Sequence, residues 1–255
     1  MCGRYASSRK PEDLAEEFEI DQASVKETVV EPLQPDFNVA PTKQVYAVVE
    51  RAQDDAARRQ LRAVRWGLVP FWAKDPKIGS RMINARMETV TEKPAFRQAF
   101  AKRRCLLPAD GYFEWYPTEQ KGKSGKPLKQ PFYIHPADDS VMAMAGLYEI
   151  WKDPTRDDDD PQRFAWTCTV LTTTAEDAVG HIHDRMPLLV EPERYAAWLD
   201  PGTSDPDELL GLLVPAAPGR LEAYPVSTQV NNVRNNGPEL LDALAPEEVA
   251  EDVPS

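Results

Sequence analysis

The sequence has 255 residues, 42% hydrophobic and 28% charged, which is typical of a globular chain that can bury a sizeable core. It contains no run of about 18 apolar residues, which excludes a membrane-spanning helix, and its N-terminal residues lack the apolar segment of a signal peptide. Three histidines, and three cysteines without a C-x-x-C spacing, argue against a disulfide framework or a metal site and favour the reducing cytoplasm.

The net charge of −12 is unevenly distributed along the chain. Residues 61–106 contain eleven basic and three acidic residues, a net charge of +8, which leaves −20 for the rest. A basic segment on an acidic body can hold a nucleic-acid strand, although a mixed surface without a partner explains the charge pattern equally well.

In the first half of the chain, apolar spacing and polar interruptions predict helices, strands and loops. The predicted elements are a helix at 12–20, strands at 45–49 and 62–66 separated by a polar loop at 51–59, an ordered loop at 66–80, and a short helix at 91–102.

The second half is dominated by predicted strands. These strands are at 104–107, 111–116, 132–134, 141–147 and 164–171, with a Lys/Gly loop at 120–130 and helices at 176–180 and 192–199. Short strands with irregular connections and helices around them indicate an α+β domain with a curled, barrel-like mixed sheet and flanking helices.

Cys2 is a candidate reactive residue because it directly follows the initiator methionine. Removal of Met1 would leave an amine and a thiol on adjacent carbons, with ordinary pKa values of about 8 and 8.5. Such a 1,2-aminothiol condenses with an aldehyde to an imine, and the thiol then closes a thiazolidine ring. The alternative is a buried, inert cysteine, which is the commoner case.

Seven motifs occur in a characteristic order along nearly the whole chain. They are MCGRY at 1–5, FNVAPT at 37–42, WGLVPFW at 66–72, INARMET at 83–89, RRCLLPADGYFEW at 103–115, IHDRMP at 182–187 and VNNVRNNGPEL at 230–240. Together they resemble the SRAP (SOS response-associated peptidase) family. The resemblance implies a single SRAP-like domain at 1–240, followed by an acidic C-terminal tail at 241–255.

The resemblance also implies an activity, which is covalent crosslinking to abasic sites in single-stranded DNA during DNA repair and the SOS response. Cys2 matches the residue that forms the thiazolidine, and Asn84 matches an asparagine near the lesion. Glu114 matches a glutamate near the amine, and His183 a histidine near the sugar. This chemistry needs no metal or organic cofactor.

A carboxylate and an imidazole can together move the protons that sugar opening and imine formation require. We expect His183 to assist ring opening and Glu114 to assist proton transfer at the Cys2 amine, although the two roles can be exchanged. Without the resemblance, Glu114 reads as a structural buried acid, and His183 beside Asp184 and Arg185 reads as part of a local polar network.

Residues of two kinds are expected to contact DNA. Arg4, Arg86 and the cluster 102–104 are candidates for phosphate contacts. The candidates for stacking on bases or wedging the strand apart are Pro41, Trp66, Phe71 and Trp72. A core position is an equally good interpretation of Trp66. The acidic segment 154–160 and the strongly acidic overall balance depart from the family pattern, and the basic loop 121–129 is either a further DNA contact or a solvated segment.

Three alternatives stay open. One is a cysteine peptidase in which Cys2 is the nucleophile, in its simplest form by removing Met1. Another is an abasic-site lyase that cuts the strand by β-elimination, and a third is a single-strand binding module in which Cys2 is incidental. The expected partner is single-stranded DNA containing abasic sites, bound by a monomer without a membrane or a metal.

Overall fold

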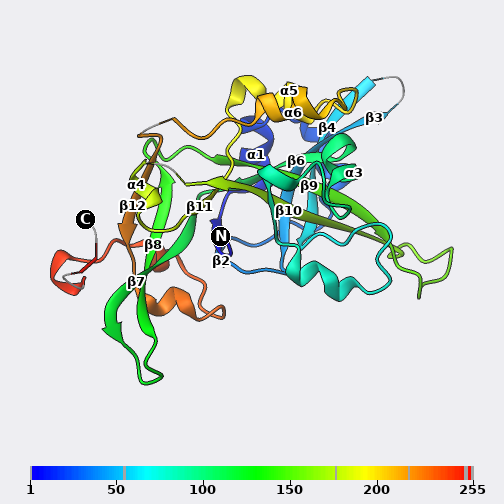
Figure 1. The fold of residues 1–255 in the computed structure, drawn as a ribbon. Helices are drawn as coiled ribbons and strands as arrows, with labels where there is room; N and C mark the ends of the chain where they lie inside the picture. Colours follow the sequence, from blue (N-terminus) through cyan, green and yellow to red (C-terminus); the bar gives the residue numbers. More distant parts are fainter. Residues whose placement is uncertain (1, 54–55, 176, 218, 250–251, 254–255) are drawn as a thin grey trace.

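The computed structural model describes residues 2–53, 56–175, 177–217, 219–249 and 252–253. Its strands form two sheets, and helices cover one side of the larger sheet (Figure 1). This arrangement confirms the predicted single α+β domain with a barrel-like mixed sheet.

Five strands of the larger sheet close into a barrel. The strands are β3 (Gln44–Gln53), β4 (Ala56–Trp66), β6 (Arg104–Ala109), β9 (Met142–Lys152) and β10 (Phe164–Thr174). Neighbours are antiparallel except β4 and β10, which run parallel, and the pairing of β10 with β9 completes the ring. Two short strands, β5 (Asn84–Arg86) and β11 (Arg185–Pro187), add to β10 near its C-terminal end.

The smaller sheet lies beside the barrel and has the strand order β12-β8-β7-β1-β2. Its strands are β1 (Tyr5–Ser7), β2 (Asp36–Val39), β7 (Gly111–Lys121), β8 (Pro127–Pro136) and β12 (Leu221–Pro225). One core cluster contains both inward-facing barrel residues such as Val64 and Cys105 and smaller-sheet residues such as Tyr5 and Tyr112. The two sheets therefore share one core.

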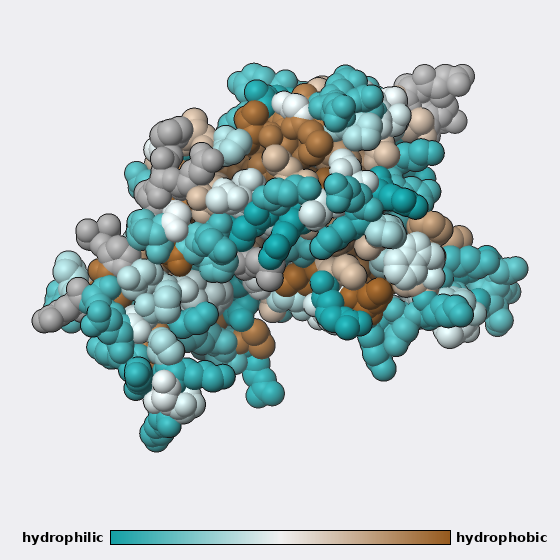
Figure 2. Space-filling model, viewed as in Figure 1, coloured by the Kyte–Doolittle hydropathy of each residue, from teal (hydrophilic) through white to brown (hydrophobic). Residues whose placement is uncertain are grey.

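Short helices pack on the outer face of the barrel. They are α1 (Pro11–Glu17), α2 (Gln22–Thr28), α3 (Arg97–Lys102), α5 (Tyr195–Leu199) and α6 (Pro206–Leu212), while α4 (Asp177–Gly180) lies near β12. Single 3-10 turns occur at Pro76–Arg81, Met87–Thr89, Pro192–Arg194, Thr228–Asn231, Pro238–Leu241 and Pro246–Glu248. No helix in the described part of the chain is long and apolar enough to cross a membrane. Hydrophilic residues dominate the face shown in Figure 2.

Several predicted elements are wrong in extent. The segment 51–59 is no loop: its described residues continue β3 and β4 as a long hairpin, whose outer end needs no apolar residues because both faces reach solvent. The helix predicted at 91–102 begins only at Arg97, after Pro94. Helices α2 and α6 were missed although Asp21 and Asp205 cap them, which is a readable start signal.

The expected phosphate contacts of the cluster 102–104 are corrected at two positions. Arg104 is buried, and its guanidinium donates hydrogen bonds to the carbonyls of Phe100, Ala101, Trp198, Asp200 and Thr203. Arg103 forms an ion pair with buried Glu149. Arg104 thus ties α3 and α5 to the barrel and is not available to DNA.

The predicted boundary at residue 240 between domain and tail stays a prediction. Residues just beyond it contact the smaller sheet, since Tyr224 donates to the Leu241 carbonyl at 2.9 Å and Leu244 donates to Pro225 at 2.9 Å.

Arg104→Ala is expected to lower the free energy of unfolding by about 3 kcal/mol, because several buried carbonyls lose their donor. Urea denaturation measures the change. Arg97→Ala, an exposed substitution on α3, should change it by less than about 0.5 kcal/mol. Equal effects of the two substitutions would contradict the structural role of Arg104.

Candidate active site at the N-terminus

Cys2 is fully buried in the core shared by the two sheets. It lies just ahead of β1, which pairs with β7 so that Tyr5 is opposite Tyr112. The Phe113 amide donates to the Arg4 carbonyl at 2.9 Å, so the chain ahead of β1 continues alongside β7. This path carries Cys2 toward Glu114, the next residue of β7.

Asn84 holds the backbone of Cys2 from the opposite side. It lies on β5, opposite Val170 of β10, and its Nδ2 donates to the Cys2 carbonyl at 2.7 Å. Its Oδ1 is buried and has no hydrogen-bond partner among the described residues. Asn84 therefore positions Cys2 and keeps an acceptor atom for a further donor.

Glu114 is only 4% exposed, and burial raises the pKa of its carboxyl. A positive charge on His183 would partly oppose this shift, so the two side chains lie close enough to interact electrostatically. Glu114 in turn raises the pKa of the Cys2 thiol, after the larger effect of burial. Cys2, Glu114 and His183 therefore belong to one electrostatically coupled site, which brings together residues far apart in the sequence.

The imidazole of His183 has two alternative partners at Nδ1. The Arg185 amide donates to Nδ1 at 3.0 Å, which requires the neutral ring with its proton on Nε2. The Asp184 carboxylate lies 2.9 Å from the same Nδ1 and pairs with the ring when it is protonated. Each protonation state thus has a local partner, as expected for a residue that exchanges protons with a substrate.

An ion pair between Arg185 and Glu88, which the sequence did not predict, lies next to His183 in the chain. Arg185 binds both carboxylate oxygens of Glu88, at 2.5 and 3.1 Å, and donates to the Thr172 carbonyl at 2.6 Å. Glu88 belongs to the INARMET motif and Arg185 to the IHDRMP motif. Their place in these motifs is the feature of the sequence from which the ion pair could have been predicted. The pair links the segments that carry Asn84 and His183 across β10.

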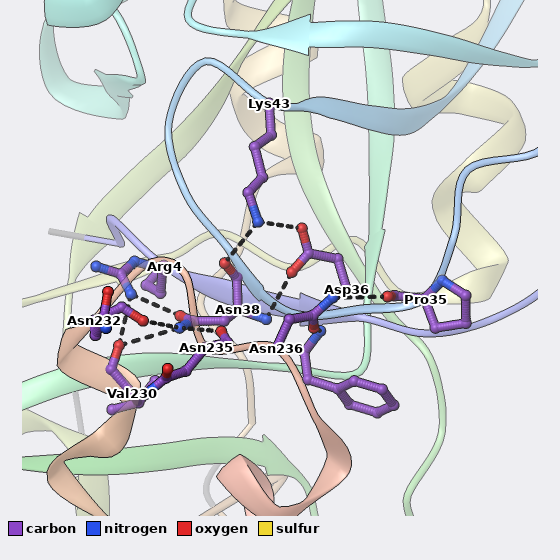
Figure 3. A network of polar contacts seen from close by, with 10 residues as sticks. Arg4, Pro35, Asp36, Asn38, Lys43, Val230, Asn232, Asn235 and Asn236 are labelled. Carbon is purple, nitrogen blue, oxygen red and sulfur yellow. Dashed lines mark hydrogen bonds and ion pairs between the residues drawn. The ribbon is translucent and has the colours of Figure 1, made fainter.

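Arg4 is held by a polar network centred on Asn38, which is fully buried (Figure 3). Arg4 Nη1 donates to Asn38 Oδ1 at 2.6 Å and to the Val230 carbonyl at 2.8 Å. Asn38 Nδ2 donates to the carbonyls of Val230, Asn232 and Asn235. The network joins the FNVAPT motif to the late VNNVRNN motif and orients Arg4 over the Trp115 ring, 5.7 Å from its centroid.

The predicted aromatic contacts with DNA divide into buried and exposed residues. Trp66 is fully buried, its Nε1 donates to Ile83, and its ring lies 5.1 Å from Tyr5, so the core interpretation is correct for this residue. Phe71 and Trp72 are 53% and 48% exposed. Pro41 is half-buried.

The loop that carries Phe71 and Trp72 is closed at its base by two glycines. Gly67 has a φ of 121°, and a Cβ there would lie 2.6 Å from the Gly79 carbonyl oxygen, so larger residues are excluded by close backbone contact. A pocket of about 410 Å³ beside Trp72 is lined by Asp75, by the apolar residues Ala73 and Ile78, and by three basic residues of this loop. The basic residues are Lys74, Lys77 and Arg81. Arg86, on β5, is also exposed.

Burial does not distinguish Cys2 from the other two cysteines; what distinguishes Cys2 is its place beside Asn84 and Glu114. Cys105 and Cys168 are fully buried, and burial raises the pKa of both thiols. Among the described residues, no group of three or more His, Cys, Asp and Glu side chains is arranged to hold a metal ion.

Comparisons with known proteins give a consistent result. The family model for SOS response associated peptidase (SRAP) matches residues 1–233. The chain is 40% identical over 244 residues to the abasic site processing protein YoaM of Bacillus subtilis, covering 95% of this chain and 98% of that protein. It is 33% identical over 251 residues to the abasic site processing protein YedK of Escherichia coli, covering 96% and 100%.

A solved structure is also similar. The fold matches a protein from Bacteroides thetaiotaomicron with a TM-score of 0.77 and 26% identity, over 96% of this chain and all of that chain.

Glu114→Gln is expected to increase the free energy of unfolding at about pH 8, because the folded state disfavours the charged carboxylate. Because the pKa of Glu114 is raised in the folded state, its protonated carboxyl stabilises the wild type fully at pH values below its pKa in the unfolded chain, about 4.3. This stabilisation is lost as the pH rises through the pKa of Glu114 in the folded protein. Urea denaturation between about pH 4 and pH 8 should show a gain that grows with pH, with exposed Glu119→Gln on the same strand as the matched control. A wild type more stable than the variant at the upper pH would contradict the raised pKa.

Proposed function

The chain belongs to the SRAP family, and from this premise we propose that it acts in DNA repair by forming a covalent crosslink between Cys2 and abasic sites in single-stranded DNA. The observation that carries the proposal is that Asn84 holds the Cys2 backbone while Glu114 interacts electrostatically with both Cys2 and His183. Relatives named abasic site processing proteins support the same lesion as substrate.

The proposed reaction begins after Met1 is removed and the Cys2 amine is released. The ring-opened sugar presents an aldehyde, and the amine attacks its C1′ to form a C–N bond and a carbinolamine. Loss of the hydroxyl as water gives the imine. The Cys2 sulfur then adds to the same carbon, its proton passes to the nitrogen, and the thiazolidine is complete.

The proton transfers are assigned to the two coupled side chains. His183 has a partner in either protonation state, which suits proton exchange with the sugar during ring opening. The raised pKa of Glu114 makes it a competent proton donor for loss of water from the carbinolamine. The two assignments can be exchanged without altering the products.

The raised pKa of the Cys2 thiol supports an order for the two bond-forming steps and disfavours the peptidase alternative. Burial raises the pKa of the Cys2 thiol, and Glu114 raises it further, so the thiolate that a cysteine peptidase needs is disfavoured. The amine is then the first nucleophile and the thiol closes the ring second. Lyase activity would result where the imine eliminates before the thiol adds.

The proposed DNA path follows exposed residues of the loop 67–80 and of β5. Arg86, Phe71 and Trp72 are exposed, and the basic residues of the pocket beside Trp72 offer positive charge for phosphates. None of these contacts reads base edges, so we expect sequence-tolerant, salt-dependent binding by a monomer.

The decisive experiment mixes the mature protein with a single-stranded oligonucleotide that carries one abasic site. We expect an adduct on a denaturing gel whose intact mass is lower by one water than the sum of the components. Cys2→Ala should abolish the adduct, and Glu114→Gln should slow its formation about a hundredfold, the usual contribution of a general acid or base. Absence of an adduct from protein whose mass confirms loss of Met1 would exclude crosslinking.

The aromatic loop gives a separate prediction. The double substitution Phe71→Ala/Trp72→Ala should weaken binding of single-stranded DNA by about 1–3 kcal/mol for each stacked base, because exposed aromatic faces are lost. Fluorescence anisotropy with a labelled oligonucleotide measures the affinity, and Val214→Ala, at another exposed apolar residue, is the control. An unchanged affinity would remove the loop from the DNA path.

A further inference from the structure

The β3–β4 and β9–β10 hairpins separate from each other at one end of the barrel, on the side of Trp66 where β4 begins. The β3–β4 pairing continues to Gln53 and Ala56, and the β9–β10 pairing continues to Lys152 and Phe164. In contrast, β4 and β10 pair only at Arg65–Trp66 and Thr167–Cys168. The two hairpins extend separately toward the right of Figure 1. Toward the tips of the two hairpins, their inner faces are therefore not joined by backbone pairing between β4 and β10.

Those inner faces carry a stack of aromatic and guanidinium groups. Tyr148 and Trp166 stack with ring centroids 5.3 Å apart and planes inclined by 13°. The Arg62 guanidinium lies 4.4 Å from the Trp166 centroid, and that of Arg51 lies 5.3 Å from it. Stacking on the indole holds two like charges side by side in defined positions.

The two arginines have no carboxylate partner among the described residues. Arg62 Nε donates to the neutral Gln60 Oε1 at 3.0 Å, and burial together with the charge of Arg51 lowers the pKa of Arg62. A lowered pKa means that the folded protein leaves this positive charge insufficiently neutralised. The site is thus one that an added anion would stabilise.

Several neighbouring acids are already engaged elsewhere, whereas Asp157 and Asp159 of the β9–β10 turn form no ion pair among the described residues. Glu50 pairs with Arg59, and Glu149, whose sequence parity places it on the opposite face of β9 from Tyr148, pairs with Arg103. In the β9–β10 turn, Asp160 pairs with Arg156, and Asp158 lies 2.7 Å from Arg163 and 3.6 Å from Lys152. Among the described residues, Arg51, Arg58 and Arg62 on this face of the β3–β4 hairpin form no ion pair with a carboxylate.

We propose that Arg51 and Arg62, stacked on Trp166, form a second phosphate-binding surface for single-stranded DNA at the barrel mouth away from Cys2. Arg58, opposite Arg51 on the hairpin and exposed, adds a third cation, and half-exposed Phe164 adds a flat apolar face. Paired guanidiniums bind phosphate oxygens through several N–H donors at once, and a single strand supplies successive phosphates and bases.

The surface would contact the strand away from the lesion. Arg62 is four residues from Trp66, or about 13 Å along β4. This inference rests on the proposed function for its DNA substrate, but it concerns retention of the strand and not the reaction at Cys2. Loss of the surface should therefore reduce binding without altering the chemistry.

The test separates these two properties with two oligonucleotides. An intact single strand of about 30 nucleotides measures retention by fluorescence anisotropy across a salt series, and an abasic oligonucleotide of about 7 nucleotides measures crosslinking. Arg51→Gln/Arg62→Gln should bind the intact strand roughly 25-fold more weakly at about 0.1 M salt and lower the salt slope by about 1.4. Its crosslinking of the short oligonucleotide should equal that of wild type.

The control is Lys10→Gln/Lys26→Gln, which removes the same charge from exposed positions around α1 and α2. An equal loss of binding in this control, or an unchanged salt slope in the arginine variant, would overturn the proposal. The single substitution Arg51→Gln, at an exposed residue, guards against misfolding and should lower the slope by about 0.7. A wild-type protein that binds the intact strand but fails to crosslink would instead exclude the proposed function alone.

Discussion

The hydrogen bond from the Asn84 side chain to the Cys2 carbonyl is the interaction on which the site depends. An N-terminal residue normally has considerable freedom, and ordering it requires contacts that offset its conformational entropy. Here Asn84 on one side and β7 on the other enclose Cys2 in the core between the two sheets. Cys2 is thus held in a defined place by Asn84 and β7 within the protein interior.

Burial has opposing consequences for stability and chemistry in this protein. It raises the pKa of Glu114 and of the Cys2 thiol, which disfavours their charged forms at neutral pH. Their presence beside an asparagine acceptor without a described partner is typical of a site adapted to a reacting molecule, where perturbed groups gather.

The motifs of the chain describe a scaffold as well as a reaction centre. Asn38 and Val230, from motifs almost two hundred residues apart, together hold Arg4. Glu88 and Arg185 join the segments of Asn84 and His183. The large basic excess of residues 61–106, in contrast, is not one surface, because Arg104 is enclosed by backbone carbonyls while Arg62 lies at the barrel mouth. Linear charge density therefore did not predict a single DNA-binding face.

The sequence by itself determined the α+β class, most strand positions and the candidate residues Cys2, Asn84, Glu114 and His183. Apolar alternation reports local burial, and ordered motifs identify a family, so both can be read without coordinates. The sequence did not predict the outer part of the β3–β4 hairpin, and it left open whether Trp66 lies in the core or on the surface. Both depend on strand pairing and packing between residues that are distant in the chain. Only the tertiary structure decided that Cys2 is enclosed, that Arg104 is structural and that Arg51 and Arg62 share one indole, since each depends on which strands the closed barrel brings together.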